Sequence, residues 1–346
     1  MNISQSLQRQ RLAVDISTIA DLIADIQLET GEIPWSEGDK TDPWDHVEAA
    51  IGLAIGGRFE NALRAFQWMR KMQLEDGSWF AAYRGGVPED KTRDTNMTAY
   101  VAAGVFHFFC MTKDKLFLDE MWHMVKRAVN FALRHQKPGG EICWAVSPHG
   151  ITDPMALLTG SSSVYMSLKC AIAIAGELKV SVPVWKEALV RLETAISSKP
   201  HAFNMTKSRF SMDWFYPVLC GAIQGDAAAK RIEKYWKKFV VEGLGVKCVS
   251  DEPWVTIAES AELVLALSAM GNTTLAHIVF GWLSDHVFED GSFWCGFTFP
   301  DMILWPAEKI AWTNAVVLMA ADALYRLTPA SNFFSHHWWE HNGYLL

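Results

Sequence analysis

Two kinds of helical segment alternate along this chain, and the alternation limits the folds open to it. Apolar residues recur at i, i+3, i+4 and i+7 through most of the sequence, which is typical of α-helices. One kind carries charges along one side and is predicted at residues 16–30, 58–74, 116–136, 183–198, 226–241 and 273–287. The other kind is apolar nearly all round and is predicted at residues 44–56, 94–111, 159–178, 211–224, 254–270 and 307–326.

The alternation predicts how these segments pack. A helix with one polar face lies at a surface, whereas a helix that is apolar all round is covered on both sides. We therefore predict a single-domain, all-α (α/α)6 toroid, in which an outer ring of helices surrounds an inner ring. The toroid is expected over residues 1–330, and the aromatic tail at residues 331–346 is expected to pack on the toroid or on a partner.

Composition excludes several classes of function. The net charge of −8 argues against nucleic acid as a partner, because phosphates attract basic surfaces. The first residues lack the apolar core of a signal peptide, and no later segment offers about 18 uninterrupted apolar residues. We expect a cytoplasmic protein without integral membrane association. No CxxC pair, P-loop or dinucleotide motif is present, so no metal and no cofactor is predicted, and the oligomeric state is left open.

A short motif occurs near both ends of the chain. Residues 73–80 read QLEDGSWF, and residues 287–294 read VFEDGSFW. Asp-Gly supplies the positive φ that a tight turn needs. In a toroid, such a turn ends an outer helix and starts the path into an inner one.

The wider repeat resembles a known pattern. Residues 68–79, WMRKMQLEDGSW, are similar to the Gln-Trp repeat of squalene and hopene cyclases and of the prenyltransferase α/α toroids. A second, degraded copy lies at 131–140, and a third at 282–291 has Val287 in the position of the Gln. The resemblance covers part of the chain and implies the toroid architecture, which by itself does not fix the chemistry.

The first 150 residues carry a second resemblance. The text from DPWDHVEAAIGL at residues 42–53 through DTNMTAYVAAGVFHFF at residues 94–109 resembles the toroidal glycoside hydrolases, including glucoamylase-like enzymes. That resemblance implies an acid and a base carboxylate on either side of the scissile bond. Inverting enzymes of this kind keep the two carboxyl groups about 6.5–9.5 Å apart to admit water.

The candidate catalytic residues are carboxylates near the N-termini of the inner helices. Because these helices run parallel in a toroid, their N-termini meet at one end of the ring. We predict that Asp45 or Asp94 faces one of Asp213, Glu252 and Glu259 across that end. Each of these carboxylates is also explained by helix capping alone.

Aromatic and polar residues at the same end are predicted to bind the substrate. A Trp beside a carboxylate suits a pyranose, whose C–H face packs on the ring while its hydroxyls bond the carboxylate; a plug of Trp in the ring centre is the alternative. The predicted substrate-binding residues are Trp44, His46, Trp79, Tyr83, Arg93, Asn96, Glu141, Trp144, Trp214, Tyr216, Asp251, Trp254, Trp294, Trp305, Glu308 and Trp312.

We therefore expect a glycoside hydrolase with a small-molecule or oligosaccharide substrate. The first alternative is a terpene cyclase or another prenyl-substrate enzyme, because aromatic faces stabilise carbocations, although the sequence has no DxDD acid motif. The second alternative is a sugar-binding toroid without catalysis. Epimerase chemistry through His46 or His149 and lyase chemistry through Tyr83 or Tyr216 also stay open.

Overall fold

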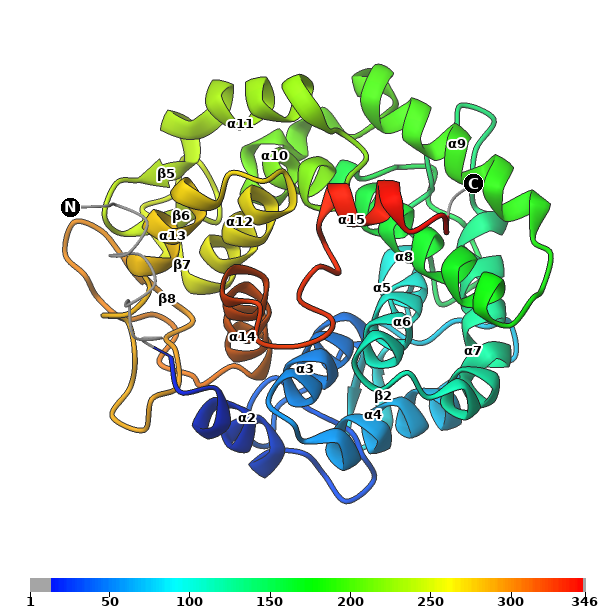
Figure 1. Ribbon diagram of the computed structural model, residues 1–346, viewed down its shortest axis with the longest axis horizontal. Helices are drawn as coiled ribbons and strands as arrows, with labels where there is room; N and C mark the ends of the chain where they lie inside the picture. Colours follow the sequence, from blue (N-terminus) through cyan, green and yellow to red (C-terminus); the bar gives the residue numbers. More distant parts are fainter. Residues whose placement is uncertain (1–13, 345–346) are drawn as a thin grey trace.

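The computed structural model describes residues 14–344, and these form a ring of helices (Figure 1). The outer helices of this part of the chain are α2 (Ile16–Asp25), α4 (Phe59–Met72), α7 (Lys115–Arg134), α9 (Pro183–Ser198), α11 (Gly225–Phe239) and α13 (Thr273–Gly281). The inner helices are α3 (Pro43–Ile55), α5 (Thr95–Ala99) with α6 (Val101–Thr112), α8 (Leu158–Glu177), α10 (Ser211–Leu219), α12 (Ile257–Ala269) and α14 (Ala311–Tyr325). The predicted (α/α)6 toroid is confirmed.

The inner helices close into a complete ring. Going round it, α3 contacts α6, then α8, α10, α12 and α14 follow, and α14 contacts α3 again. In α3 Asp45 is half-buried and every other residue is buried, because the helix is covered by α2 and α4 outside and by its ring neighbours on each side. The apolar segments of the sequence are thus the inner ring, as predicted.

One glutamine joins each of several outer helices to the next. The side-chain amide of Gln73, at the end of α4, donates to the carbonyl oxygen of Gly77 at 2.9 Å. It also donates to the carbonyl oxygen of Met124 on α7 at 2.9 Å. A single side chain therefore closes its own turn and fastens that turn to the neighbouring outer helix.

The same arrangement occurs at two further positions. Gln136 donates to the carbonyl of the glycine four residues later and to that of Ala188 on α9, both at 2.9 Å. Gln27 does the same with the carbonyls of Gly31 and of Asn61 on α4, both at 3.0 Å. We call these three sites the glutamine clamps; the copy at Gln27 was not found from the sequence.

The glycine of each clamp presses against the next outer helix. Gly77 has φ +93°, and a Cβ there would lie 2.4 Å from the carbonyl oxygen of Arg127. At Gly31 and Gly140 the φ values are +94° and +105°, and a Cβ would lie 2.3 and 2.2 Å from a carbonyl of α4 and α9. Only glycine allows both this conformation and this close approach.

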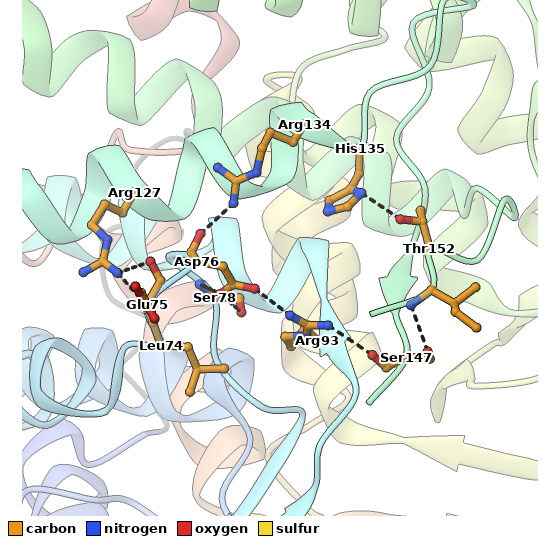
Figure 2. A network of polar contacts seen from close by, with 11 residues as sticks. Leu74, Glu75, Asp76, Ser78, Arg93, Arg127, Arg134, His135, Ser147 and Thr152 are labelled. Atoms are coloured by element: carbon orange, nitrogen blue, oxygen red, sulfur yellow. Dashed lines mark hydrogen bonds and ion pairs between the residues drawn. The ribbon is translucent and has the colours of Figure 1, made fainter. Parts of the chain in front are cut away.

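Arginines complete the first of the repeated turns (Figure 2). Arg127 donates to the carbonyl of Leu74 at 2.7 Å, and Arg134 donates to that of Asp76 at 2.6 Å. Arg93 pairs with the Asp76 carboxylate at 2.7 Å and donates to the Ser147 carbonyl at 3.1 Å. Arg93 thus holds loops together and does not line the cavity described below.

Short strands lie in the loops between helices. They are β1 (Ala82–Arg84), β2 (Val87–Asp90), β3 (Arg93–Asp94), β4 (Ala145–Val146), β5 (Val240–Val241), β6 (Gly245–Lys247), β7 (Trp254–Thr256) and β8 (Gly296–Thr298), with 3₁₀ turns η1 (Pro200–Ala202) and η2 (Met205–Arg209). The antiparallel sheet β5-β6-β7-β8 changes one helix boundary: residues 254–256, predicted as helix, pair with β6 and β8, so α12 begins at Ile257. Similarly, the last inner helix begins at Ala311 instead of 307.

The C-terminal segment crosses the ring at its centre (Figure 1). It contains α15 (His336–His341), whose Trp339 ring lies 5.7 Å from that of Phe106 on α6. The His336 ring contacts the Val218 carbonyl of α10 at 2.7 Å. Because these partners lie in the C-terminal halves of inner helices, the tail covers that end of the ring and lies away from the N-terminal end.

Replacing Gly77 by Ala tests the clamp. We expect a fall in the free energy of unfolding of about 2–5 kcal/mol, because a Cβ adds left-handed strain and a clash with the α7 backbone. Gly57 is the matched control, since its φ is +76° and nothing lies within 4 Å of its Cβ position. Gly57→Ala should cost about 1–2 kcal/mol. Equal losses in chemical denaturation would contradict the close-contact role of Gly77.

Candidate active site

A cavity of about 490 Å³ opens at the N-terminal ends of the inner helices. Its wall is built from the first turns of α3, α5, α8 and α10 and from the loops that precede α12 and α14. The parallel inner helices therefore bring distant parts of the sequence to one place, as the toroid predicts. Nine of the predicted site residues line this cavity, namely Trp44, Asp45, Asp94, Asn96, Trp144, Trp254, Trp305, Glu308 and Trp312.

Several other predicted residues have structural roles away from the cavity. Trp79 donates its indole N–H to the Met69 carbonyl at 2.8 Å, and the Tyr83 hydroxyl accepts from the Phe80 N–H at 2.9 Å. Both side chains are buried, and they follow the turn that Gln73 closes. The predicted substrate contacts of Trp79 and Tyr83 are thus replaced by contacts that fix the turn.

His46 is also structural. Its Nδ1 accepts from the Ile33 N–H at 3.1 Å, and its Nε2 contacts the Ala65 carbonyl at 3.0 Å. Burial lowers the pKa of the imidazole to about 4, so the ring is neutral at physiological pH. A histidine with both nitrogens engaged by backbone has none left for a substrate, which removes it as an epimerase base.

Three further predicted residues pack within the scaffold. Trp214 donates to the Arg231 carbonyl at 3.0 Å, and Trp294 lies with its ring 5.4 Å from that of His286. Glu141 pairs with Lys137 at 3.6 Å. None of Trp214, Trp294 and Glu141 lines the cavity.

Three predicted carboxylates also lie away from it. Asp213 accepts from the Thr159 hydroxyl at 2.7 Å and from the Thr159 N–H at 3.2 Å, which ties α10 to the start of α8. Asp251 and Glu252 are exposed and pair with Arg209 at 2.8 and 3.5 Å. They precede strand β7 rather than a helix, so the chain carries them to the outer surface.

Glu259 is buried in the first turn of α12 and does not itself line the cavity, whereas Cys295 does. Burial, and then the carboxylates of Glu259, Glu308 and Asp45, raises the pKa of the Cys295 thiol to about 12. Carboxylates on α12, on the loop before α14 and on α3 therefore all disfavour the thiolate form of Cys295 at the cavity wall.

Asp45 lies in the first turn of α3 beside a carboxylate that the sequence prediction omitted. Asp42 caps α3 by accepting from the Asp45 N–H at 2.9 Å, and it accepts from the Trp35 indole at 2.6 Å. Burial first, and then the charges of Asp42 and Glu48, raises the pKa of Asp45 well above its ordinary range. Asp45 consequently retains its proton at a pH where an exposed Asp is ionised.

Two tyrosine–glutamate pairs lie close to Asp45 in the ring interior. The Tyr100 hydroxyl donates to Glu48 at 2.9 Å, and the Tyr216 hydroxyl donates to Glu262. The ring of Trp44 stacks on Tyr100 with centroids 4.1 Å apart and lies 5.9 Å from Tyr216. Tyr216, predicted to bind substrate, instead supports Trp44, which lines the cavity.

The pair residues Glu48 and Glu262 are strongly shifted in pKa. Burial raises the pKa of Glu48 to about 8, and burial together with the charge of Glu48 raises that of Glu262 well above its ordinary range. The sequence signal was available: each lies three residues, nearly one helical turn, after Asp45 or Glu259 in an otherwise apolar segment. A carboxylate in an inner helix has no solvent to reach, so it marks the ring interior.

Asp94 lines the cavity but also serves as a cap. It accepts from the N–H groups of Asn96 at 2.7 Å and Met97 at 2.9 Å. Burial nevertheless raises its pKa to about 6. Within residues 14–344, no group of three or more His, Cys, Asp or Glu side chains is arranged to hold a metal ion.

The buried Glu48 carboxyl group should make the stability of the protein depend on pH. Because the folded-state pKa of Glu48 is raised from 4.5 to about 8, its contribution is fully present below pH 4.5 and is lost as pH rises to about 8. We expect Glu48→Gln to flatten the fall in stability by about 1.4 kcal/mol per pH unit across this range. Thermal melts at several pH values measure the effect. Glu60→Gln, on the exposed side of α4, is the control and should leave the pH profile unchanged.

Comparison with known proteins identifies the relatives of this chain. No family model matches it. The chain is 49% identical over 315 residues to the "MMP endo-(1,4)-3-O-methyl-alpha-D-mannosidase" of Mycolicibacterium hassiacum, which covers 91% of this chain and 87% of that protein. In the part of the chain that the structure describes, every helix is too short or too polar to cross a bilayer.

Solved structures show the same fold at low sequence identity. A wild-type glycosidase superposes with TM-score 0.70 at 16% identity over 94% of this chain and 99% of its own. The mannosylglycerate hydrolase of Thermus thermophilus gives 0.71 at 12% identity, with coverage of 88% and 99%. These structures show the fold, while the M. hassiacum relative supports the glycosidase prediction. The comparisons do not support the terpene cyclase alternative. The chain belongs to the family of the M. hassiacum endo-mannosidase and is a glycoside hydrolase.

Proposed function

We propose that this glycosidase cleaves within chains of (1,4)-linked 3-O-methyl-α-D-mannose, with Asp45 as general acid. The proposed substrate is supported by the 49% identity, over 91% of the chain, to a protein named for that activity. The observation that supports the acid is the position of Asp45 in the cavity wall with a pKa raised by burial.

The raised pKa suits the role of Asp45. A general acid has to carry a proton before it protonates the departing glycosidic oxygen. Burial disfavours the carboxylate, and the neighbouring charge of Asp42 disfavours it further. Asp45 is thereby suited to be the protonated member of the catalytic pair.

We assign the other member to Glu259. Of the carboxylates expected opposite Asp45, Asp213 is engaged by Thr159, and Glu252 lies on the surface with Arg209. Glu259 comes from α12, which is separated from α3 by α14 in the inner ring. In the proposed reaction, Asp45 gives its proton to the leaving oxygen as the bond to the anomeric carbon breaks. Water then attacks that carbon and passes its proton to Glu259.

The apolar part of the cavity suits a methyl ether. Met97, Ile142, Leu157 and Met212 line it, from four different segments of the chain. A free sugar hydroxyl placed against such side chains would lose its hydrogen bonds, whereas a methyl ether has no proton to donate. Each buried methyl group contributes about 0.8 kcal/mol, so this wall favours the methylated sugar.

Substitution of the two carboxylates tests the assignment. We expect Asp45→Asn and Glu259→Gln each to lower kcat by about 10²- to 10⁴-fold, the amount that general acid or base catalysis supplies. Glu252→Gln removes the same charge from an exposed position and should keep wild-type activity. Hydrolysis of a methylated (1,4)-mannoside, followed by product analysis, gives the rates. Near-wild-type turnover by Asp45→Asn would remove it as the acid.

The methyl preference can be measured separately. Wild-type kcat/KM should favour methylated over unmethylated (1,4)-mannosides by about fourfold for each methyl group that the cavity buries. Met212→Thr places a hydroxyl in the wall and should reduce that ratio. Met205→Thr is the matched control, because Met205 is 61% exposed and does not line the cavity. An unchanged ratio in Met212→Thr would show that the methyl group lies elsewhere.

A further inference from the structure

A large aromatic side chain stands exposed at the rim of the cavity. Trp305 is 59% exposed although it also lines the cavity. Ile303, two residues earlier, is 58% exposed, and Met302 is 39% exposed. An apolar surface that continues outward from a binding cavity is typical of a surface that ligand covers.

The backbone holds Trp305 in place despite this exposure. The Trp254 indole donates to the Trp305 carbonyl at 2.8 Å, and the two rings meet edge to face with centroids 5.2 Å apart. The Trp305 N–H donates to the Gly296 carbonyl at 2.9 Å, and the Thr298 N–H donates to that of Ile303 at 2.9 Å. The rim segment is therefore fastened to strands β7 and β8, and its apolar face is fixed before any ligand arrives.

A long substrate has to leave the cavity somewhere along its rim. A volume of about 490 Å³ suits a ligand of drug size and is too small for a long oligosaccharide. Trp305 lies on the loop before α14, while Trp144 lines the cavity from the loop before α8. Because α8 and α14 lie on opposite sides of the inner ring, a chain that crosses the cavity between these loops meets an aromatic side chain at each edge.

The charges beside this surface narrow the class of ligand. Glu308 follows Trp305 on the same loop, Asp301 precedes it, and both are exposed. The neighbouring Lys309 is paired with Asp290. Carboxylates at this edge disfavour an anionic lipid or nucleic acid and accept hydrogen bonds from neutral hydroxyl groups. A pyranose combines such hydroxyls with an apolar C–H face, which the indole can cover.

We propose that Trp305, supported by Trp254, forms an outer subsite for a sugar unit beyond those held in the cavity. The identity of that sugar as a methylated mannose rests on the proposed function. The subsite makes affinity depend on chain length: a chain long enough to reach Trp305 gains a contact that a short chain does not make. Trp305 acts here on substrate selection and not on the bond that is cleaved.

The experiment compares a short and a long (1,4)-linked methylmannose oligosaccharide, the second long enough to extend past the cavity rim. Titration calorimetry gives Kd for each, and initial rates give kcat/KM. Trp305→Ala should reduce the ratio of long-chain to short-chain affinity by about tenfold, equivalent to about 1.4 kcal/mol. That is the loss expected when roughly 60 Å² of apolar contact is removed. Trp305→Phe keeps an aromatic face and should retain most of the ratio.

The control is Leu116→Ala, at the start of α7. Leu116 is 83% exposed and does not line the cavity, so its loss should leave the length dependence unchanged. An equal loss on both chain lengths in Trp305→Ala would overturn the outer subsite, as would a wild type that binds both lengths equally well. Length-dependent binding without hydrolysis would support the subsite while defeating the proposed function. Hydrolysis without length-dependent binding would support the proposed function and overturn the outer subsite.

Discussion

The side-chain amides of three glutamines fasten the first four helices of the outer ring to one another. At Gln27, Gln73 and Gln136 the amide bonds its own turn and a carbonyl of the next outer helix, at 2.9–3.0 Å. The glycine four residues later brings the two backbones within reach. The four outer helices α2, α4, α7 and α9 are thereby fixed relative to one another, and so are the turns at their C-terminal ends.

The two ends of the ring differ, and this difference separates stability from chemistry. At one end the C-terminal segment packs its aromatic rings on Phe106 and covers the C-terminal halves of the inner helices. At the other end the first turns of those helices surround the cavity. Glu48 and Glu262 lie in the interior near Asp45. Burial disfavours their ionised forms and raises their pKa values. A negative charge on either glutamate disfavours ionisation of Asp45.

Sequence periodicity predicted the ring and the end at which the cavity opens, because apolar inner helices and charged outer helices are local properties of the chain. It also located Asp45 and Trp44, which sit in a first helical turn. It could not separate residues that face the cavity from those that brace a turn, since Trp79 and Trp305 look alike in sequence. Glu252 was expected at the mouth because residues 254–256 look helical. Their pairing with β6 and β8 depends on contacts from distant segments, and it moves Glu252 outward.

In the mechanism that we propose, the carboxylates of α3 and α12 act on a sugar chain bound across this cavity. A crystal structure of the Glu259→Gln variant with a methylated (1,4)-mannoside oligosaccharide tests it most directly. We predict that one glycosidic oxygen lies within hydrogen-bonding distance, about 2.6–3.2 Å, of the Asp45 carboxyl group, with sugar units continuing on both sides of it. An oligosaccharide bound with no glycosidic oxygen near Asp45, or bound outside the cavity, would contradict the catalytic role of Asp45.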